Sequence, residues 1–516
     1  MLTRISMMSS KKDLSHKLIL FLSSKRFFAI SVAVFVIESA WIALSARYPQ
    51  AFDEQFHLGI IKLYARQYSP FFGHQPPGAN IFGALFRDPS FLYHYLMSFP
   101  YRWIAHFTGD LTIQVIILRF INIGLLGSSL FIFKRVLRYT PASAALINTT
   151  LLFFVLTPVV PLLGSQINYD NLTVPLTGLV VWWCLRFIDQ LKTANVWRWD
   201  ILVQLAIFCL LGSLVKYAFL PIFAGLFAII IYSWLKYRRA TPVYSFRLNW
   251  LKKGALMLAL LVSVGLFGQM YGTNTLRYHT PVPDCDQVLS VQQCQAYAPW
   301  ARNYLEHVQK GPTTLVKIAA YPFDWLYHSM GELVFTIASG FNDSGDVDYW
   351  VGSQLIIIEV VSWTVFAAGA VLVLLYVRRI WRSETLRVFV VVSFLYVAAL
   401  GGQNFLDFLS TGEPVAIHGR YLLPVLPLIY IIVALAVRRA LGSFKLARIS
   451  VANRKLSLTA AMMVLLLFEG GGFVTYIVRS DPSWFWPQSS HAQAVNSKAK
   501  KILKPIVLDI KKKQTN

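Results

Sequence analysis

Long apolar runs alternate with short polar segments along almost the whole chain. Most runs have the length of about 20 residues that a helix needs to cross a membrane. Because backbone groups at membrane depth must be hydrogen-bonded within the protein, we expect these runs to be helices. The pattern predicts an all-α polytopic membrane protein with about 11 transmembrane helices. Their predicted ranges are 27–47, 113–133, 143–161, 171–188, 200–215, 218–236, 254–273, 354–377, 388–403, 420–437 and 458–478.

Composition agrees with this class. Hydrophobic residues make up 56% of the 516 residues, charged residues 14%, and the mean hydropathy is +0.54. The formal net charge of +24 would suggest nucleic-acid binding if it were spread over a soluble surface. More than half of the 48 lysines and arginines instead lie before the first predicted helix or in the loops that follow every second helix. The positive-inside rule makes these segments cytoplasmic, so the charge mainly reports topology.

This topology divides the chain into a cytoplasmic basic N-terminus (1–26), a transmembrane domain (27–479) and a lysine-rich tail (480–516). Two long loops of the transmembrane domain, 48–112 and 274–353, are predicted to be extracytoplasmic. The first contains apolar positions at helical spacing and an aromatic-rich segment, which indicate interfacial helices. An odd number of spans puts the tail on the same side. Its seven lysines run against the charge bias of that side, which a miscounted span would also explain, and a lysine-rich tail can lie along anionic headgroups.

Four cysteines separate into two kinds. Cys184 and Cys209 fall inside predicted helices and are expected to be packing residues. Cys285 and Cys294 lie nine residues apart in the longest outside loop. On an oxidising face, such a pair predicts a disulfide.

Acidic residues gather on the predicted outer side, which holds 17 of the 24. Asp53 and Glu54 follow the first predicted helix directly, and four further outer segments bring other polar groups. Each group alone has an ordinary explanation as a helix end, a turn, a snorkelling lysine or a solvated face. Their convergence on one side predicts a site there. The further candidates are Asn168, Asp170, Lys216, Asp324, Glu413, His418 and Arg420.

Three glutamates within the predicted spans favour a different class of protein. Glu38, Glu359 and Glu469 would suit a transporter or flippase of a lipid-linked sugar, because intramembrane carboxylates are costly and often functional. Protonated glutamates bonded within a helix bundle explain them equally. No internal repeat supports transport. A receptor or assembly scaffold that uses the outer loops is a third alternative.

With these residues assembled, the chain resembles the GT-C superfamily of integral-membrane glycosyltransferases, which use polyprenyl-phosphate sugars as donors. The resemblance runs in order from about residue 27 to 437. In bacterial members, the first loop often contains a His-Pro-Pro-Leu-Tyr stretch, of which RDPSFLYHY is at best a degenerate form, so the role of His94 stays open. The similar motifs are FDEQFH, the YHYL segment, LRFINIGLLG (118–127), INYDNL (167–172), LVKYAFLP (214–221) and HGRYLLPVLP (418–427).

The resemblance implies an inverting monosaccharide transferase, since oligosaccharide-transferring members carry a large soluble C-terminal domain. Asp53 would be the general base, and Glu54 would support the base or the acceptor. Arg420 would bind the donor phosphate, with Lys216 and His418 as second choices. Weaker candidates for substrate binding are Asn168, Asp170, His94, Glu413 and Asp324.

The implied partners are the lipid-linked donor, a glycan, glycolipid or protein acceptor, and the bilayer itself. The implied location is the plasma (inner) membrane, with the N-terminus in the cytoplasm and the site outside. No cofactor is required, because a phosphate leaves as an anion, although Mg²⁺ or Mn²⁺ serves some relatives. The sequence NDSGDVD (342–348) holds three aspartates but lacks the glutamate of a calcium-binding loop, so we assign no metal site.

Overall fold

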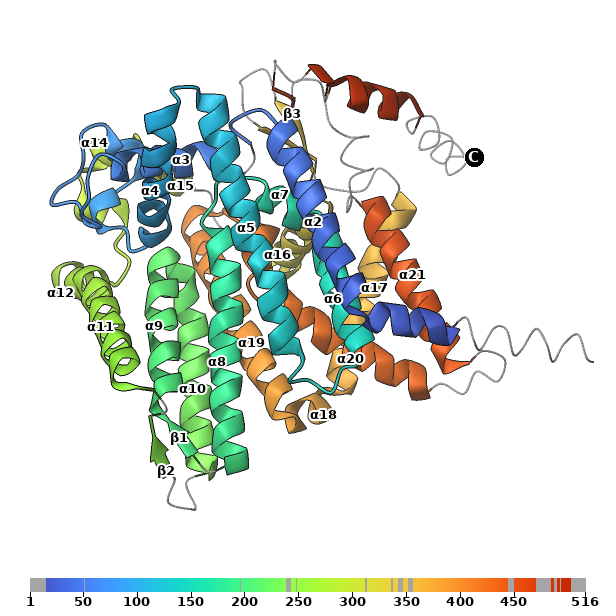
Figure 1. Ribbon diagram of the computed structural model, residues 1–516. Coiled ribbons are helices and arrows are strands. Elements are labelled where there is room, and N and C mark those ends of the chain that lie inside the picture. Colours follow the sequence, from blue (N-terminus) through green and yellow to red (C-terminus); the bar gives the residue numbers. More distant parts are fainter. Residues whose placement is uncertain are drawn as a thin grey trace, which may run out of the picture.

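The computed structural model describes most of the chain. The described residues are 15–50, 52–194, 196–237, 243–246, 248–310, 313–335, 337–341, 347–350, 356–443, 450–469, 484–486, 490–491 and 493–502. Helices dominate this part of the chain (Figure 1). Two small two-stranded sheets accompany them: β1 (Val196–Arg198) runs parallel to β2 (Val243–Ser245), and β3 (Ile337–Phe341) pairs antiparallel with β4 (Val347–Trp350).

Each of the 11 ranges predicted to span the membrane overlaps at least one helix. Seven helical segments are long and apolar enough to cross a membrane, by length and composition, so the predicted polytopic helical class is confirmed. The number of 11 spans stays a prediction. The helices that overlap the 11 predicted ranges include α2 (Lys25–Ser45), α5 (Leu111–Leu137), α6 (Ala144–Leu156), α7 (Val159–Gly164), α8 (Asp170–Ala194), α9 (Trp199–Val215), α10 (Leu220–Tyr237), α11 (Trp250–Phe267), α17 (Ile356–Leu375), α19 (Glu384–Thr411), α20 (Leu426–Ser443) and α21 (Val451–Glu469).

Prolines make two of the predicted ranges wrong in detail. The range 143–161 is two helices, α6 and α7, because Thr157 is extended ahead of Pro158. A residue before proline is disfavoured in the helical conformation. The range 420–437 begins too early, since α20 starts only at Leu426, next to Pro427. Arg420 therefore lies in a single 3-10 turn, η5 (Gly419–Leu422), outside any long helix.

The predicted outer loops lie together at one end of the molecule. In the first loop, α3 (Glu54–Tyr64) and α4 (Leu92–Phe107) match the two predicted helices, with short turns η1 (Ala79–Phe82) and η2 (Leu85–Arg87) between them. Figure 1 shows α3, α4, α14 and α15 at this end, while β1, β2 and α18 (Val377–Arg382) lie at the opposite end. The second loop contributes α13 (Cys285–Val288), α14 (Val291–Cys294), α15 (Ala298–Val308) and α16 (Leu315–Phe335), after α12 (Thr273–Tyr278).

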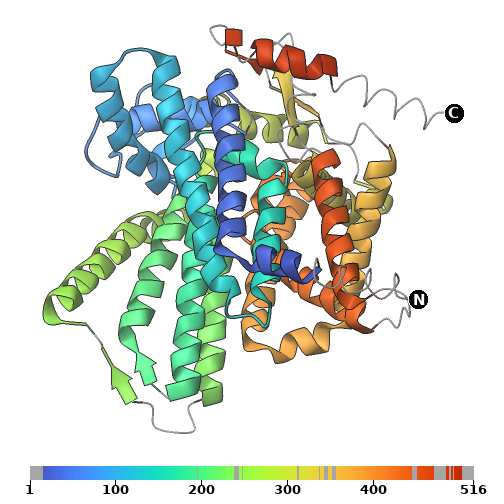
Figure 2. The ribbon, with the colours of Figure 1, turned by 45° about the vertical axis from the view of Figure 1, so that its right-hand side comes forward.

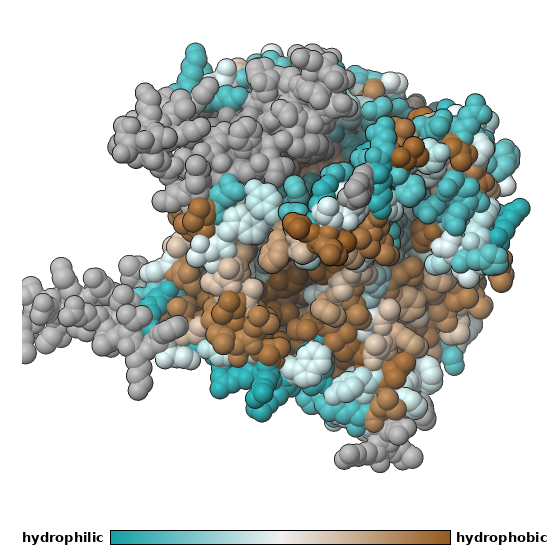
Figure 3. Space-filling model, turned by 180° about the vertical axis from the view of Figure 1, so that it is seen from behind, coloured by the Kyte–Doolittle hydropathy of each residue, from teal (hydrophilic) through white to brown (hydrophobic). Residues whose placement is uncertain are grey.

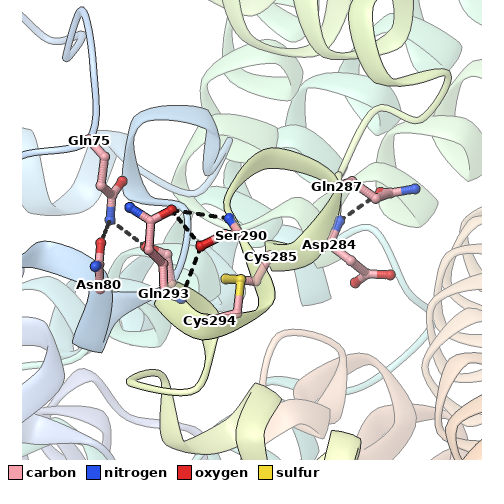
Figure 4. The surroundings of a disulfide bond; sticks show 9 residues. Gln75, Asn80, Asp284, Cys285, Gln287, Ser290, Gln293 and Cys294 are labelled. Carbon is pink, nitrogen blue, oxygen red and sulfur yellow. Dashed lines mark hydrogen bonds between the residues drawn. A yellow bond between two sulfur atoms is a disulfide. The ribbon is translucent and has the colours of Figure 1, made fainter.

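The two outer loops pack on each other around a disulfide. Cys285 and Cys294 are bonded, as the sequence predicts. Figure 4 shows the bond between α13 and α14, beside Gln75 and Asn80 of the first loop. The remaining cysteines, Cys184 and Cys209, are free and buried in helices, also as predicted.

The surface between the two ends is apolar. Figure 3 shows a brown hydrophobic band across the middle of one face, with hydrophilic residues above and below it. Large exposed hydrophobic side chains on α10, α11 and α19 include Phe227, Leu258, Leu261 and Phe394. Such a belt is what contact with lipid requires, since apolar side chains there have no water to avoid.

Candidate active site

Asp53 stands at the start of α3, but it does not serve as a helix cap. Its side chain makes no capping hydrogen bond, although Asp is a favoured cap residue. Asp53 and the preceding Phe52 both have left-handed backbones, with φ values of 65° and 55°. Each such conformation costs a non-glycine residue about 1–3 kcal/mol and tends to persist at functional sites. The explanation of Asp53 as an ordinary helix end is therefore weak.

The carboxylate of Asp53 faces the guanidinium of Arg420. Nη2 of Arg420 donates to Oδ2 of Asp53 at 2.8 Å. The Asp53 side chain is 63% exposed, whereas that of Arg420 is only 4% exposed. Two other nitrogens of this buried cation, Nε and Nη1, have no hydrogen-bond partner among the described residues. Buried donors of this kind call for an acceptor, and a guanidinium favours an anion with two oxygens.

An ion pair that is buried on both sides lies beside the Asp53–Arg420 pair. Nζ of Lys216, in the connection between α9 and α10, donates to Oδ1 of Asp170 at 2.6 Å. Oδ2 of Asp170 is buried without a hydrogen-bond partner among the described residues. The ring of Tyr421 lies 4.2 Å from Nζ of Lys216 and 5.1 Å from the guanidinium carbon of Arg420. Both cations therefore lie within cation–π range of the same aromatic ring.

Glu54 is fully buried and supports Asp53 from behind. Its carboxylate accepts two hydrogen bonds from Arg119, at 2.8 and 2.7 Å, and one each from the amides of Gln50 and Ile167. Arg119 also donates to main-chain carbonyls at the end of α2, including Ala46 at 2.6 Å. These bonds satisfy Glu54 within the chain and leave it out of reach of a substrate. Its role is therefore to position the residue before it.

The loop that precedes α8 closes over the same region. Nδ2 of Asn168 donates to the carbonyl of Phe52 at 3.0 Å, and its Oδ1 accepts from the amide of Asp170 at 2.9 Å. Asn122 on α5 accepts from Nδ2 of Asn171 at 3.0 Å. Asn168 therefore joins the strained segment at Phe52 to the start of α8. It shapes the site, while Asp170 retains an oxygen for a ligand.

His94, a predicted substrate contact, is instead buried in a histidine pair. Nε2 of His94 lies 2.9 Å from Nδ1 of His57, and Nδ1 of His94 lies 3.2 Å from the carbonyl oxygen of Ser90. Burial and the neighbouring His94, with Arg420 and Lys216, hold the pKa of His57 well below its usual value. Burial lowers the pKa of His94 to about 3. Both rings are consequently neutral at physiological pH.

His418 contacts α16 rather than the cation pair. Its Nδ1 lies 2.9 Å from Oε1 of Glu332, whose other oxygen accepts from the amide of Gly419. Glu332 is largely buried, while Asp324 on the same helix is exposed. Glu413 forms an exposed pair with Lys317 at 3.2 Å. Asp324 and Glu413 thus lie on the solvated surface, and His418 anchors the turn that holds Arg420.

The cations around Asp53 set its protonation. Burial by the surrounding chain would raise the pKa of Asp53, but Arg420, His418 and Lys216 outweigh it and lower the pKa. The carboxylate is therefore ionised at neutral pH and can accept a proton. A divalent ion does not fit this place well, because the nearest partner of Asp53 is already a cation.

No group of three or more His, Cys, Asp and Glu side chains suited to a metal occurs among the described residues. The aspartates Asp343 and Asp346 of the loop 342–348 lie outside those residues.

Several residues of this cluster are not among the site candidates predicted from the sequence. Arg119 is the most informative, because a charged residue within a membrane-length apolar helix is itself a signal of function or of a buried partner. Asn122 follows it by one helical turn. His57 and Tyr421, like Arg119 and Asn122, lie inside motifs of the family resemblance, but nothing in the spacing of the two aromatic residues distinguishes them from packing residues.

The sequence matches no family model and no curated protein. Solved structures that the chain matches at low identity include the following three. One is an oligosaccharyltransferase from Archaeoglobus fulgidus tethered with an acceptor peptide, at 11% identity and a TM-score of 0.44, over 92% of this chain and 59% of that one. Another is AglB from the same organism with an inhibitory peptide and a dolichol-phosphate. Its identity is 13% and its TM-score 0.41, over 91% of this chain and 59% of that one. The third is ArnT from Cupriavidus metallidurans bound to undecaprenyl phosphate. Its identity is 14% and its TM-score 0.39, over 93% of this chain and 70% of that one.

This chain therefore spans 59% of the length of the archaeal proteins.

Proposed function

We propose that this protein is a membrane glycosyltransferase that moves a monosaccharide, a hexose or a pentose, from a polyprenyl-phosphate donor to an acceptor hydroxyl. The observation that carries the proposal is the pairing of an exposed, ionised Asp53 with a buried Arg420, two of whose donors have no partner among the described residues. A base beside an anion site is the minimum that displacement of a phosphate by a hydroxyl requires. The family resemblance of the sequence supplies the identity of the donor.

In the proposed step, the acceptor oxygen attacks C1 of the sugar from the face opposite the phosphate. The new C1–O bond forms as the bond from C1 to the phosphate oxygen breaks, which inverts the configuration. Asp53 takes the proton of the acceptor hydroxyl, and the polyprenyl phosphate leaves with the bonding electron pair. Arg420 and Lys216 stabilise the charge that develops on the phosphate, in a place where low water content strengthens their effect.

The other residues divide between the substrate and the protein itself. Oδ2 of Asp170 can accept a hydrogen bond from a hydroxyl of the sugar. Glu54, Asn168 and the histidine pair hold the loop that carries Asp53. We place the acceptor, which is a component of the cell envelope or a lipid-linked molecule, on the extracytoplasmic face of the plasma membrane. If Mg²⁺ or Mn²⁺ takes part, it acts at a place other than the Asp53–Arg420 pair.

The proposal is tested by comparing glycans and lipids from cells that carry wild-type protein, Asp53→Asn or the exposed control Asp324→Asn. Mass spectrometry should show one sugar lost from a glycan in Asp53→Asn, with accumulation of its polyprenyl-phosphate form. Loss of a general base lowers the rate by about 10²–10⁴-fold. Asp324→Asn should match wild type.

A profile of Asp53→Asn equal to wild type, while deletion of the protein changes it, would contradict the base assignment. Glu38→Gln and Glu359→Gln would then test transport. Glu359 lies in the first turn of α17, where Tyr327 donates to it at 3.4 Å, and Glu38 is buried in α2. The side chain of Glu469 lies outside the described residues.

A further inference from the structure

A short segment near the C-terminus returns to the end of α2. The amide of Arg47 donates to the carbonyl of Trp484 at 2.7 Å, and the amide of Trp486 donates to the carbonyl of Ser45 at 3.0 Å. An antiparallel bridge joins Ala46 to Phe485 between these bonds. The side chains of the segment are buried, with exposed fractions of 0%, 5% and 8% for residues 484 to 486. We call residues 484–486 the C-terminal strap.

The strap covers the ion pair that lies behind Asp53. The ring of Trp486 lies 5.6 Å from the guanidinium carbon of Arg119. Arg119 in turn donates to the carbonyls of Ala43, Ala46 and Arg47, and to both carboxylate oxygens of Glu54. The strap therefore holds residues 45 to 47 through their backbone, and Arg119 holds the carbonyls of Ala46 and Arg47 in the same stretch. Trp486 therefore packs against the guanidinium that bonds Glu54, and both side chains of this ion pair are fully buried.

We propose that the C-terminal strap is a positioning element of the active site. The strap holds the end of α2 and Arg119 in place. Arg119 and the end of α2 position Glu54, and Glu54 in turn bonds the amide of Gln50 in the loop that leads to Asp53. A buried ion pair keeps its strength only while its hydrogen bonds are complete and water is excluded. The left-handed backbone of Phe52 and Asp53 likewise persists only where its surroundings determine it fully. The effect on catalysis rests on the proposed function, whereas the effect on the loop does not.

The described residues beyond the strap lie at the same end of the molecule as the proposed site. The helical residues 490–491 and 493–502, red in Figures 1 and 2, lie at the same end of the molecule as α3 and α4 in both views. The strap precedes this helix and follows α21. The side of the tail, predicted to be extracytoplasmic from the number of spans, is thus the side of the proposed site.

Two truncations of the protein test the proposal. A stop after residue 483 removes the strap, and a stop after Trp486 keeps it while removing everything beyond. Hydrogen exchange, measured by mass spectrometry on protein in detergent, reports the amides of Gln50 and Ile167, which Glu54 holds in place. Transfer kinetics and binding of a polyprenyl-phosphate donor are measured on the same samples.

The chain that ends at 483 should exchange these amides about tenfold faster. Its kcat should fall about 10–100-fold with donor binding kept, because small displacements of a catalytic group cost that much. The chain that ends at Trp486 should match wild type within about twofold in both readouts. Equal exchange in the two truncated chains overturns the proposal. Faster exchange in the shorter chain, with no transfer by wild type, supports the strap and overturns the proposed function.

If the shorter chain does not accumulate, a substitution in the full chain replaces it. Trp486→Leu removes the ring over Arg119 and leaves the backbone pairing. Trp103→Leu is the control, because Trp103 on α4 is 70% exposed. Exchange of the Gln50 and Ile167 amides should rise at least about threefold in Trp486→Leu alone. Unchanged exchange in that variant overturns the proposal.

Discussion

At the scale of single residues, the site contains ion pairs that differ in how much of each side chain is exposed. Glu54 and Arg119 have no exposed side-chain surface, so their pairing is structural. Breaking such a buried pair by removing one partner costs about 3–5 kcal/mol, because the other charge is left uncompensated. Asp53 differs in being exposed while its partner is buried. The neighbouring acids Asp53 and Glu54 therefore have separate tasks, one toward the substrate and one toward the protein.

The histidine pair predicts how stability depends on pH. His57 and His94 keep lowered pKa values in the folded protein, and that of His94 is about 3. The unfolded chain would bind protons on both near pH 6.5, where the folded protein does not. Stability is then highest above that pH and falls as the pH drops from about 6.5 toward 3. We expect the unfolding temperature in detergent to fall between pH 7 and pH 5.

The variant His94→Gln should show a smaller fall over this range, since it removes one of the two groups. Its stability at pH 7 should be lower by about 1–3 kcal/mol, because His57 loses its partner. His328→Gln is the matched control, as His328 is exposed on α16. A pH dependence that is the same in wild type and His94→Gln would show that the pair is not the source.

At the scale of elements, the turn η5 must approach α16 very closely. A Cβ atom on Gly419 would lie 2.4 Å from the amide nitrogen of Leu333 and from the carbonyl oxygen of Ser329. The backbone of both elements would have to shift. Because Arg420 follows in the same turn, such a shift moves the guanidinium away from Asp53.

Gly419→Ala should therefore lower transfer at least about tenfold and destabilise the protein by about 1–3 kcal/mol. The control is Gly402→Ala on α19, where an added Cβ meets no atom within 4 Å. That change should be neutral or stabilise by about 0.5–1 kcal/mol, because alanine suits a helix better than glycine. Equal behaviour of the two variants in thermal unfolding would refute the importance of this contact.

At the scale of the whole molecule, the two ends differ in charge and in structure. The acid-rich loops, the disulfide and the candidate site share one end, and the basic loops lie at the other. The positive-inside rule predicts that the site faces out of the cytoplasm. The apolar belt in Figure 3 separates the two ends.

Labelling of single added cysteines tests this orientation. Ser69→Cys lies at the predicted outer end and Thr193→Cys at the predicted inner end, and both positions are exposed. The native cysteines give little background, because two are bonded and two are buried. A membrane-impermeant maleimide should label position 69 on intact cells and position 193 only after permeabilisation. The reverse pattern would place the site in the cytoplasm.

The sequence by itself determined the local structure. Apolar runs placed a helix in each predicted range, because burial in lipid forces the backbone to bond within itself. The prolines at 158 and 427 indicate where two predicted ranges break, although the hydrophobic pattern alone does not show these breaks. The disulfide also followed from local spacing. Asp53, Arg420, Lys216 and Asp170 were found as candidates because the predicted topology puts their segments on one side of the membrane.

Only the tertiary structure decided which of these residues meet. Asp53 and Arg420 are 367 residues apart, and Glu54 and Arg119 are 65 apart. No local pattern indicates such a pairing, because it depends on how the helices pack against one another. The same packing turned Glu54 inward, put His94 in a buried pair and left Asp324 on the surface. It also brought the C-terminal strap back to α2, which no spacing in the sequence indicates.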